Sequence, residues 1–134
     1  MDKIDVYTAG CCPKQGVSSY GAMLSAGESV FESAKKIGNR TKTQADMISI
    51  IMAMRCIVPD VDNRCRAVTL HISSVYAYQM LDRQDGEWVN KVRANAEIVN
   101  EARAMICMFP NLTIDKIDSK SPQIQRCVEI AKNA

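Results

Sequence analysis

Three segments with strand-like patterns near the start of the chain constrain the fold most strongly. Residues 3–8 alternate apolar and polar side chains, and two more extended segments are expected at Tyr20–Ser25 and Ser29–Lys36. A turn rich in Gly, Pro and Ser separates the first two segments, and Gly10 and Gly38 end the first and third. Three short strands joined by tight turns predict an antiparallel meander.

After the meander the apolar spacing becomes helical. Thr43–Val58 places its apolar residues on one stripe, Thr43 caps the first turn, and Pro59 ends the helix. Residues 60–66 are polar and are expected to form a loop. The other predicted elements are a strand at 67–72, a short helix ending at Leu81, a long helix at 89–108, a strand at 112–117 and a last helix at Pro122–Lys132. No repeat or linker interrupts this order, so the 134 residues are expected to form one domain.

Net charge and cysteine content argue against some classes of protein and of metal site. A net charge of +2 and a pI of about 8.2 are too mild to identify a dedicated basic nucleic-acid module. The six cysteines have no C-x-x-C spacing and only one histidine accompanies them, which argues against a structural zinc site. The N-terminal residues resemble no signal peptide, and no apolar run approaches the ~18 residues that span a membrane. We expect a cytoplasmic chain with reduced thiols and no membrane partner.

Short motifs along the chain resemble those of the ribonuclease H family. Val6–Gly10 stands where the family has a strand ending in Tyr-Thr-Asp-Gly, and Tyr20–Ala22 matches the Tyr-Gly-Ala of its second strand. Three later matches fall at the first helix, the fourth strand and the last helix, at Thr41–Asp46, Ile72–Tyr76 and Arg126–Ala131. Each motif is weak alone, and the resemblance depends on five of them in the correct order over nearly the whole chain.

The resemblance implies an α/β fold of the ribonuclease H-like type. In that family a mixed five-stranded sheet begins with an antiparallel three-strand meander, and helices cover both faces. The order of elements read from the periodicity agrees with this arrangement. We therefore expect residues 1–134 to form a single ribonuclease H-like domain.

The catalytic positions of the family can be compared one by one. Ribonuclease H cleavage uses two magnesium ions, which need several convergent carboxylates. The resemblance places the family's four carboxylates at Ala9, Asp46, Ser73 and Val128. Three of these cannot bind a metal as anions, and the loop at 118–121, where the family has a mobile histidine, has none; the single His71 is expected to be structural. The resemblance therefore implies a pseudoenzyme, not an enzyme, with no catalytic residue, no metal and no cofactor.

Loss of acidic side chains would remove repulsion between the former active-site groove and a phosphate backbone. We therefore expect the groove to bind RNA or an RNA/DNA hybrid without cutting it. The family grips RNA with the turn after its first strand, the start of its first helix and the end of its fourth strand, and basic residues flank the matching segments here. The resulting candidate residues are Lys14, Gln15, Ser18, Ser19, Arg40, Lys42, Thr43, Gln44, Ser73, Ser74, Lys91, Arg93 and Lys120.

Three other interpretations stay open, one of which is a degenerate domain detached from a larger polymerase or integrase assembly. A scaffold protein could use an apolar helix face at Met105–Phe109 to join partners or to self-associate. A metal-dependent nuclease could use a displaced site built from Asp5, Asp115, Asp118 and Glu129. A two-residue shift along a strand moves a ligand by ~6.6 Å, and Glu129 is rotated by ~100° from Val128, which argues against the displaced site. Degenerate ribonuclease H folds are common in viruses, which suggests a viral origin and a location in the host-cell cytoplasm.

Overall fold

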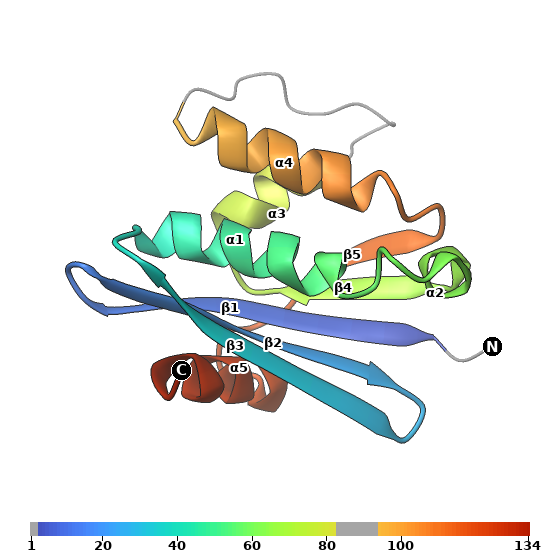
Figure 1. Ribbon diagram of the computed structural model, residues 1–134, viewed down its shortest axis with the longest axis horizontal. Helices are drawn as coiled ribbons and strands as arrows, with labels where there is room; N and C mark the ends of the chain where they lie inside the picture. The colour runs from blue at the N-terminus through green and yellow to red at the C-terminus, as the bar shows by residue number, and fades with distance from the viewer. Residues whose placement is uncertain (1–2, 83–93) are drawn as a thin grey trace.

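The computed structural model describes residues 3–82 and 94–134, which form one five-stranded sheet with helices on both faces (Figure 1). The strands are β1 (Ile4–Lys14), β2 (Val17–Ala26), β3 (Ser29–Gly38), β4 (Val68–Ile72) and β5 (Leu112–Lys116). They lie in the order β3-β2-β1-β4-β5. The first three pair antiparallel, whereas β4 pairs parallel to both β1 and β5. The predicted mixed sheet with an antiparallel meander is confirmed.

The helices divide between the two faces of the sheet (Figure 1). They are α1 (Lys42–Arg55), α2 (Val61–Cys65), α3 (Val75–Leu81), α4 (Ala96–Ile106) and α5 (Pro122–Lys132). Helices α1, α3 and α4 lie on one side, where Met47, Ile50 and Met54 of α1 join the main core with Val6 and Leu70 of the sheet. Of the helices in the described part of the chain, only α5 covers the other side. None of the helices in the described ranges is long and apolar enough to cross a membrane.

Several predicted bounds differ from the structure, and the residue that caps α1 is Thr41, not the predicted Thr43. The prediction that Gly10 ends the first strand is wrong, because Gly10 and Cys11 still pair with β2 and the strand continues to Lys14. The predicted loop at 60–66 contains α2, which Asp60 caps by accepting a hydrogen bond from the backbone N–H of Asn63. The long helix predicted at 89–108 is represented by α4, and its predicted first residues lie outside the described ranges.

The apolar segment Met105–Phe109 does not present a continuous exposed face. Ile106 and Phe109 are buried in the main core, and Met108 alone among the large apolar side chains of this segment is strongly exposed. Most of the apolar helix face that a scaffold protein was expected to use is therefore buried in the core.

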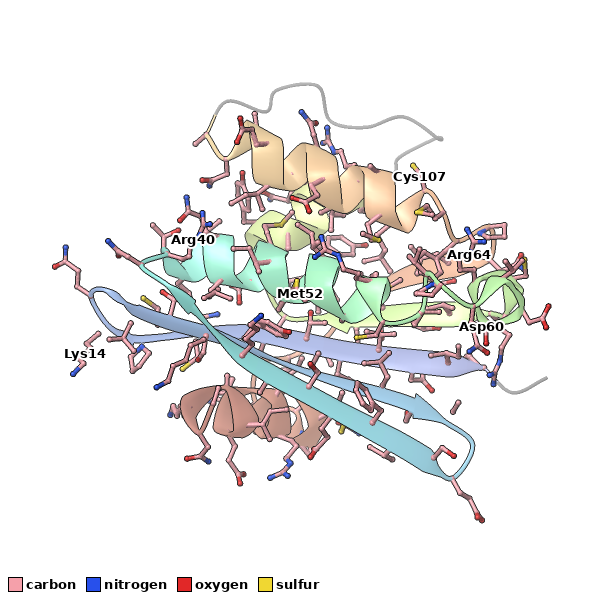
Figure 2. The ribbon with its side chains drawn as sticks, in the orientation of Figure 1. Lys14, Arg40, Met52, Asp60, Arg64 and Cys107 are labelled. Carbon is pink, nitrogen blue, oxygen red and sulfur yellow. The ribbon has the colours of Figure 1, made fainter. Side chains whose placement is uncertain are left out.

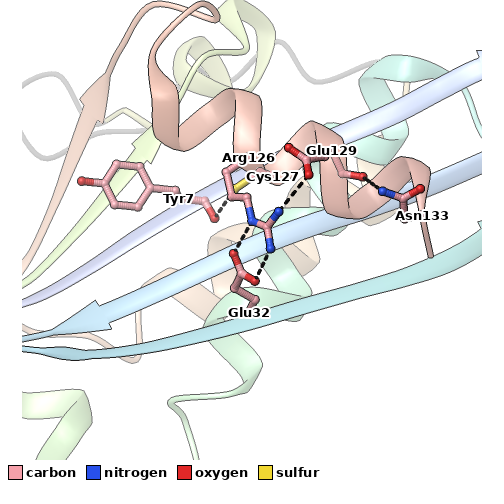
Figure 3. Close-up of polar contacts among 6 residues, drawn as sticks. All are labelled: Tyr7, Glu32, Arg126, Cys127, Glu129 and Asn133. Atoms are coloured by element: carbon pink, nitrogen blue, oxygen red, sulfur yellow. Dashed lines mark hydrogen bonds and ion pairs between the residues drawn. The ribbon is translucent and has the colours of Figure 1, made fainter.

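Helix α5 docks closely on the meander. Gly21 of β2 lies directly under the backbone of Cys127, and the Ser19 hydroxyl donates a 2.6 Å hydrogen bond to the carbonyl oxygen of Ala131. At the outer edge, Arg126 forms two hydrogen bonds of 2.7 and 2.9 Å with Glu32 of β3 (Figure 3). These bonds hold the pKa of Glu32 below its ordinary value. Backbone contact at the centre and charged pairs at the rim thus fix α5 on the sheet.

Candidate nucleic-acid interface

The start of α1 is tied to the start of α4. The hydroxyl oxygen of Thr41 accepts a hydrogen bond from the backbone N–H of Gln44, and the Gln44 side-chain oxygen accepts one from the backbone N–H of Thr41, both at 3.1 Å. The same Gln44 side chain donates a 3.0 Å hydrogen bond to the side-chain oxygen of Asn95, which precedes α4. The first pair is a capping box that satisfies free N–H groups of α1. One glutamine therefore caps one helix and holds the beginning of another.

The β1–β2 hairpin reaches the same end of the molecule. The Ser18 hydroxyl donates a 2.6 Å hydrogen bond to the carbonyl oxygen of Arg40 and accepts one of 3.0 Å from its backbone N–H. The Cys12 thiol also contacts the Arg40 carbonyl oxygen, at 3.4 Å. Lys14, near the hairpin tip, and Arg40 consequently lie at one end of the molecule, while Arg64 lies at the other (Figure 2).

A pocket of about 370 Å³ opens between the first turns of α1 and α4. Its lining consists of Arg40, Gln44, Asn95, Ala96, Glu97 and Ile98. The N-terminal ends of two helices carry partial positive charge, and the first N–H groups of α4 have no side-chain cap, which is the environment that a phosphate oxygen prefers. Arg40 adds a full positive charge at the rim, and Glu97 adds an opposing negative one. A phosphate group in this pocket would meet the uncapped N–H groups at the start of α4.

Asn95 lines this pocket in a left-handed conformation with φ of 60°, and it was not among the residues predicted from the sequence. The available signal was an asparagine two residues before Glu97, a pattern typical of a helix start. Because apolar residues recur at helical spacing on both sides of Asn95, the sequence predicted one continuous helix from residue 89. No helix start was therefore predicted at Asn95. Asparagine adopts positive φ more readily than most residues, which suits it to this position.

The structure brings some of the predicted binding residues together and separates others. Lys14, Gln15, Arg40, Lys42, Thr43 and Gln44 lie in or beside the hairpin, the pocket and the start of α1. Ser18 and Ser19 are buried and their hydroxyls bond backbone carbonyl oxygens, while the Ser74 hydroxyl caps α3. Ser73 follows the last residue of β4, and Lys120 is exposed in the turn before α5. Lys91 and Arg93 lie outside the described residues.

The four positions matched to catalytic carboxylates do not fit a pair of magnesium ions. The Asp46 Oδ1 atom accepts hydrogen bonds from the Gly10 backbone N–H at 2.8 Å and from the Lys42 ammonium at 2.6 Å. Ala9 and Val128 belong to the apolar cluster under α5, with Ile124 and Cys127. In the residues that the structure describes, no group of three or more His, Cys, Asp or Glu side chains is arranged to hold a metal ion.

His71 lies in a polar cluster that joins three strands. Its Nε2 atom is 2.8 Å from Asp5 of β1, its Nδ1 atom is 2.9 Å from Asp115 of β5, and its ring stacks on Tyr7 with centroids 4.4 Å apart. Both contacts are satisfied together when both ring nitrogens carry a proton. Burial, followed by the charges of Asp5 and Asp115, raises the pKa of Tyr7. The expected structural role of His71 agrees with these contacts, because the ring links the two carboxylates.

Replacement of His71 with leucine is expected to lower the free energy of unfolding by about 1–3 kcal/mol. The variant keeps the bulk of the side chain, yet it leaves Asp5 and Asp115 without their shared donor and facing each other. Urea denaturation followed by circular dichroism measures the change. Adding Asp115→Asn to the leucine variant removes the repulsion and should recover part of the loss. An unchanged urea midpoint for His71→Leu would show that the cluster contributes nothing to stability.

Comparison with known proteins gives matches among solved structures. No protein-family model and no curated protein sequence matches this chain. The ribonuclease H1 of the archaeon Halobacterium salinarum is similar with a TM-score of 0.78 at 20% identity, over 98% of this chain and 96% of that one. A ribonuclease H domain from Mycobacterium tuberculosis has a TM-score of 0.75 at 19% identity, over 98% of both chains. LC11-RNase H1 in complex with an RNA/DNA hybrid has a TM-score of 0.78 at 21% identity, covering 98% and 95%.

These matches correct one prediction. The structures similar to this chain are ribonuclease H enzymes, which contradicts the expectation that the chain is not an enzyme. That expectation depended on short motif matches for Ala9, Ser73 and Val128, and nothing in the comparisons shows that catalytic residues have been lost. Self-association finds no support in the comparisons either. The agreement in strand order, helix placement and coverage establishes that this chain has the ribonuclease H-like fold.

Proposed function

We propose that this chain binds nucleic acid containing an RNA strand, as an RNA/DNA hybrid or as RNA. The binding surface is the end of the molecule where the β1–β2 hairpin meets the starts of α1 and α4. The observation that carries the proposal is the pocket between these two helix starts, with Arg40 at its rim. Its donors suit a phosphate group, and every nucleic acid presents phosphates at regular spacing.

Exposed positive charge beside the pocket supports the proposal. Lys14, Arg40 and Lys42 are exposed and come from the hairpin, from the connection before α1 and from its first residue. Within the described residues, the Lys14 and Arg40 side chains have no ion-pair partner. Unpaired surface cations can release counterions when they meet phosphates, which favours binding. The hybrid bound to LC11-RNase H1, a protein of the same fold, is the reason for choosing a ligand with an RNA strand.

The chemistry of these side chains predicts little sequence preference. Lysine, arginine and helix N–H groups serve here as donors for a backbone, and the side-chain amide of Gln44 is already bonded to the Thr41 N–H and to Asn95. The affinity should therefore fall steeply as salt concentration rises and vary little among hybrids of different sequence. A cytoplasmic location for this activity is part of the same proposal.

Charge reversal tests the surface. Arg40→Glu and Lys14→Glu are each expected to weaken binding of a fluorescent RNA/DNA hybrid roughly tenfold in EDTA at low salt. Arg64→Glu, at the opposite end of the molecule, makes the same change in net charge and serves as the control, with a thermal melt to confirm that replacement of this partly buried side chain leaves the protein folded (Figure 2). Fluorescence anisotropy gives the affinities, and a denaturing gel of the recovered strands with added magnesium records any cleavage. Equal weakening by all three variants would mean that only net charge matters and that this surface is not the binding site.

A further inference from the structure

Lys42 occupies a position that helix energetics disfavour. It is the first residue of α1, which has no acidic residue in its first turn. A positive charge at a helix N-terminus opposes the helix dipole, and a lysine that precedes its acidic partner by four residues is the less favourable order for an ion pair on a helix. Helix stability therefore does not account for a lysine at this place, and its partner has to be considered instead.

Asp46, the partner, cannot move away from the interface. Its Oδ1 atom accepts the backbone N–H of Gly10 at 2.8 Å, and its side chain is only 14% exposed. An added Cβ at Gly10 would lie 2.5 Å from the backbone nitrogen of Asp46, so the strand and the helix are in direct contact here. The Lys42 ammonium lies 2.6 Å from the same Oδ1 atom, and the lysine side chain is 59% exposed. A fixed carboxylate thus lies beneath a cation that faces solvent.

The pair belongs to the proposed binding surface. Lys42 follows the capping residue Thr41 and lies two residues after Arg40, which lines the pocket between α1 and α4. Without the ammonium, the Asp46 carboxylate would repel a phosphate backbone that passes the start of α1. The side chains described around Asp46 do not form a group that could hold a metal ion in its place.

We propose that the Lys42 ammonium is the permanent counter-cation of Asp46, so that this surface accepts a phosphate backbone without a divalent metal ion. The proposal rests on the proposed function and specifies its ionic requirement. The ammonium performs two tasks at once, because it neutralises the carboxylate and presents positive charge to the phosphates. A divalent cation is needed only when the lysine is absent.

The test compares metal responses among variants. Binding of a fluorescent RNA/DNA hybrid is measured in EDTA and in Ca²⁺ at constant ionic strength, since Ca²⁺ binds carboxylate oxygens readily. Wild type is expected to bind equally in both. Lys42→Gln should lose roughly tenfold in EDTA and recover most of it in Ca²⁺, because the ion can bind the Asp46 carboxylate together with a phosphate oxygen of the nucleic acid, which supplies ligands that the protein alone lacks. Lys14→Gln, the matched control, removes an exposed lysine with no carboxylate partner among the described residues and should weaken binding without a Ca²⁺ response.

A double variant separates charge from shape. Lys42→Gln combined with Asp46→Asn removes both charges and should bind in EDTA more tightly than Lys42→Gln alone, with no gain from Ca²⁺. A Ca²⁺ response of Lys42→Gln no larger than that of Lys14→Gln would overturn the proposal, as would a wild type that gains affinity from Ca²⁺. A wild type that binds no hybrid in either buffer would overturn the proposed function itself. Thermal melts followed by circular dichroism confirm that each variant is folded.

Discussion

Replacement of Gly21 with alanine is expected to lower the free energy of unfolding by about 3 kcal/mol or more. A Cβ at this position would lie 2.0 Å from the backbone oxygen of Cys127 and 2.8 Å from its carbonyl carbon. Both atoms belong to the backbone of α5, so the overlap is relieved only if the whole helix moves away from β2. That movement would open the apolar cluster of Ala9, Ile124 and Cys127 to water.

Two measurements check the Gly21 prediction. Urea denaturation gives the loss of stability, and alkylation with peptide mapping reports whether α5 has lifted. In the native protein burial raises the pKa of Cys127 to about 12, so its thiolate is scarce and alkylation should be slow. Gly16→Ala is the control, because nothing lies within 4 Å of its added Cβ and only its φ of +84° is unfavourable, a cost of about 1 kcal/mol. Equal losses in the two variants, with Cys127 still protected, would contradict the prediction.

Replacement of Gly10 with alanine is expected to destabilise the protein by a comparable amount, about 3 kcal/mol. Its Cβ would lie 2.5 Å from the backbone carbon of Ala45 and 2.5 Å from the backbone nitrogen of Asp46. These atoms belong to α1, which must therefore move away from β1. The movement would also break the 2.8 Å hydrogen bond between the Gly10 N–H and Asp46.

Asp46→Ala separates the two causes of the Gly10 effect. It removes the hydrogen bond to Gly10 and the exposed ion pair with Lys42, which contributes little to stability, without adding an atom between β1 and α1, and it should cost about 1–2 kcal/mol. Urea midpoints of the two variants, measured together, give the steric part by difference. If Gly10→Ala is no less stable than Asp46→Ala, the close approach of helix and strand is not what requires glycine at this position.

The spacing of apolar residues alone predicted the helices and strands that bury one face and expose the other. The bounds Pro122–Lys132 of α5 agree with the prediction, because Ile124, Cys127 and Ala131 recur at helical spacing after a proline start. The end of β1 was predicted wrongly, because Gly10 was expected to stop the strand. In the structure Gly10 lies within the strand, and its lack of a side chain allows α1 to pack closely against it. A strand stop and a close contact both favour glycine, and only the packed structure distinguishes them.

The candidate site was predicted only in part, for a similar reason. Arg40, Lys42 and Gln44 were found because they surround the start of one helix. The link from Gln44 to Asn95 spans 51 residues, and the contact between His71 and Asp5 spans 66. Such pairs depend on strand register and on helix packing, which a local pattern does not encode. Ser18 and Ser19 were predicted to contact the nucleic acid because their hydroxyls suit a phosphate. In the structure both hydroxyls bond backbone carbonyl oxygens of the protein.

The hydrogen bond from Ser19 to Ala131 also bears on the rate of folding. This hydrogen bond joins residues 112 positions apart in the chain, whereas the strands of the meander, on which α5 packs, are neighbours in sequence. Closing so long a loop costs conformational entropy before the contacts under α5 can form. Topologies with distant contacts fold slowly, so docking of α5 should be a late step in folding. Until that step, the sheet surface around Ala9 is open to any apolar segment that reaches it first.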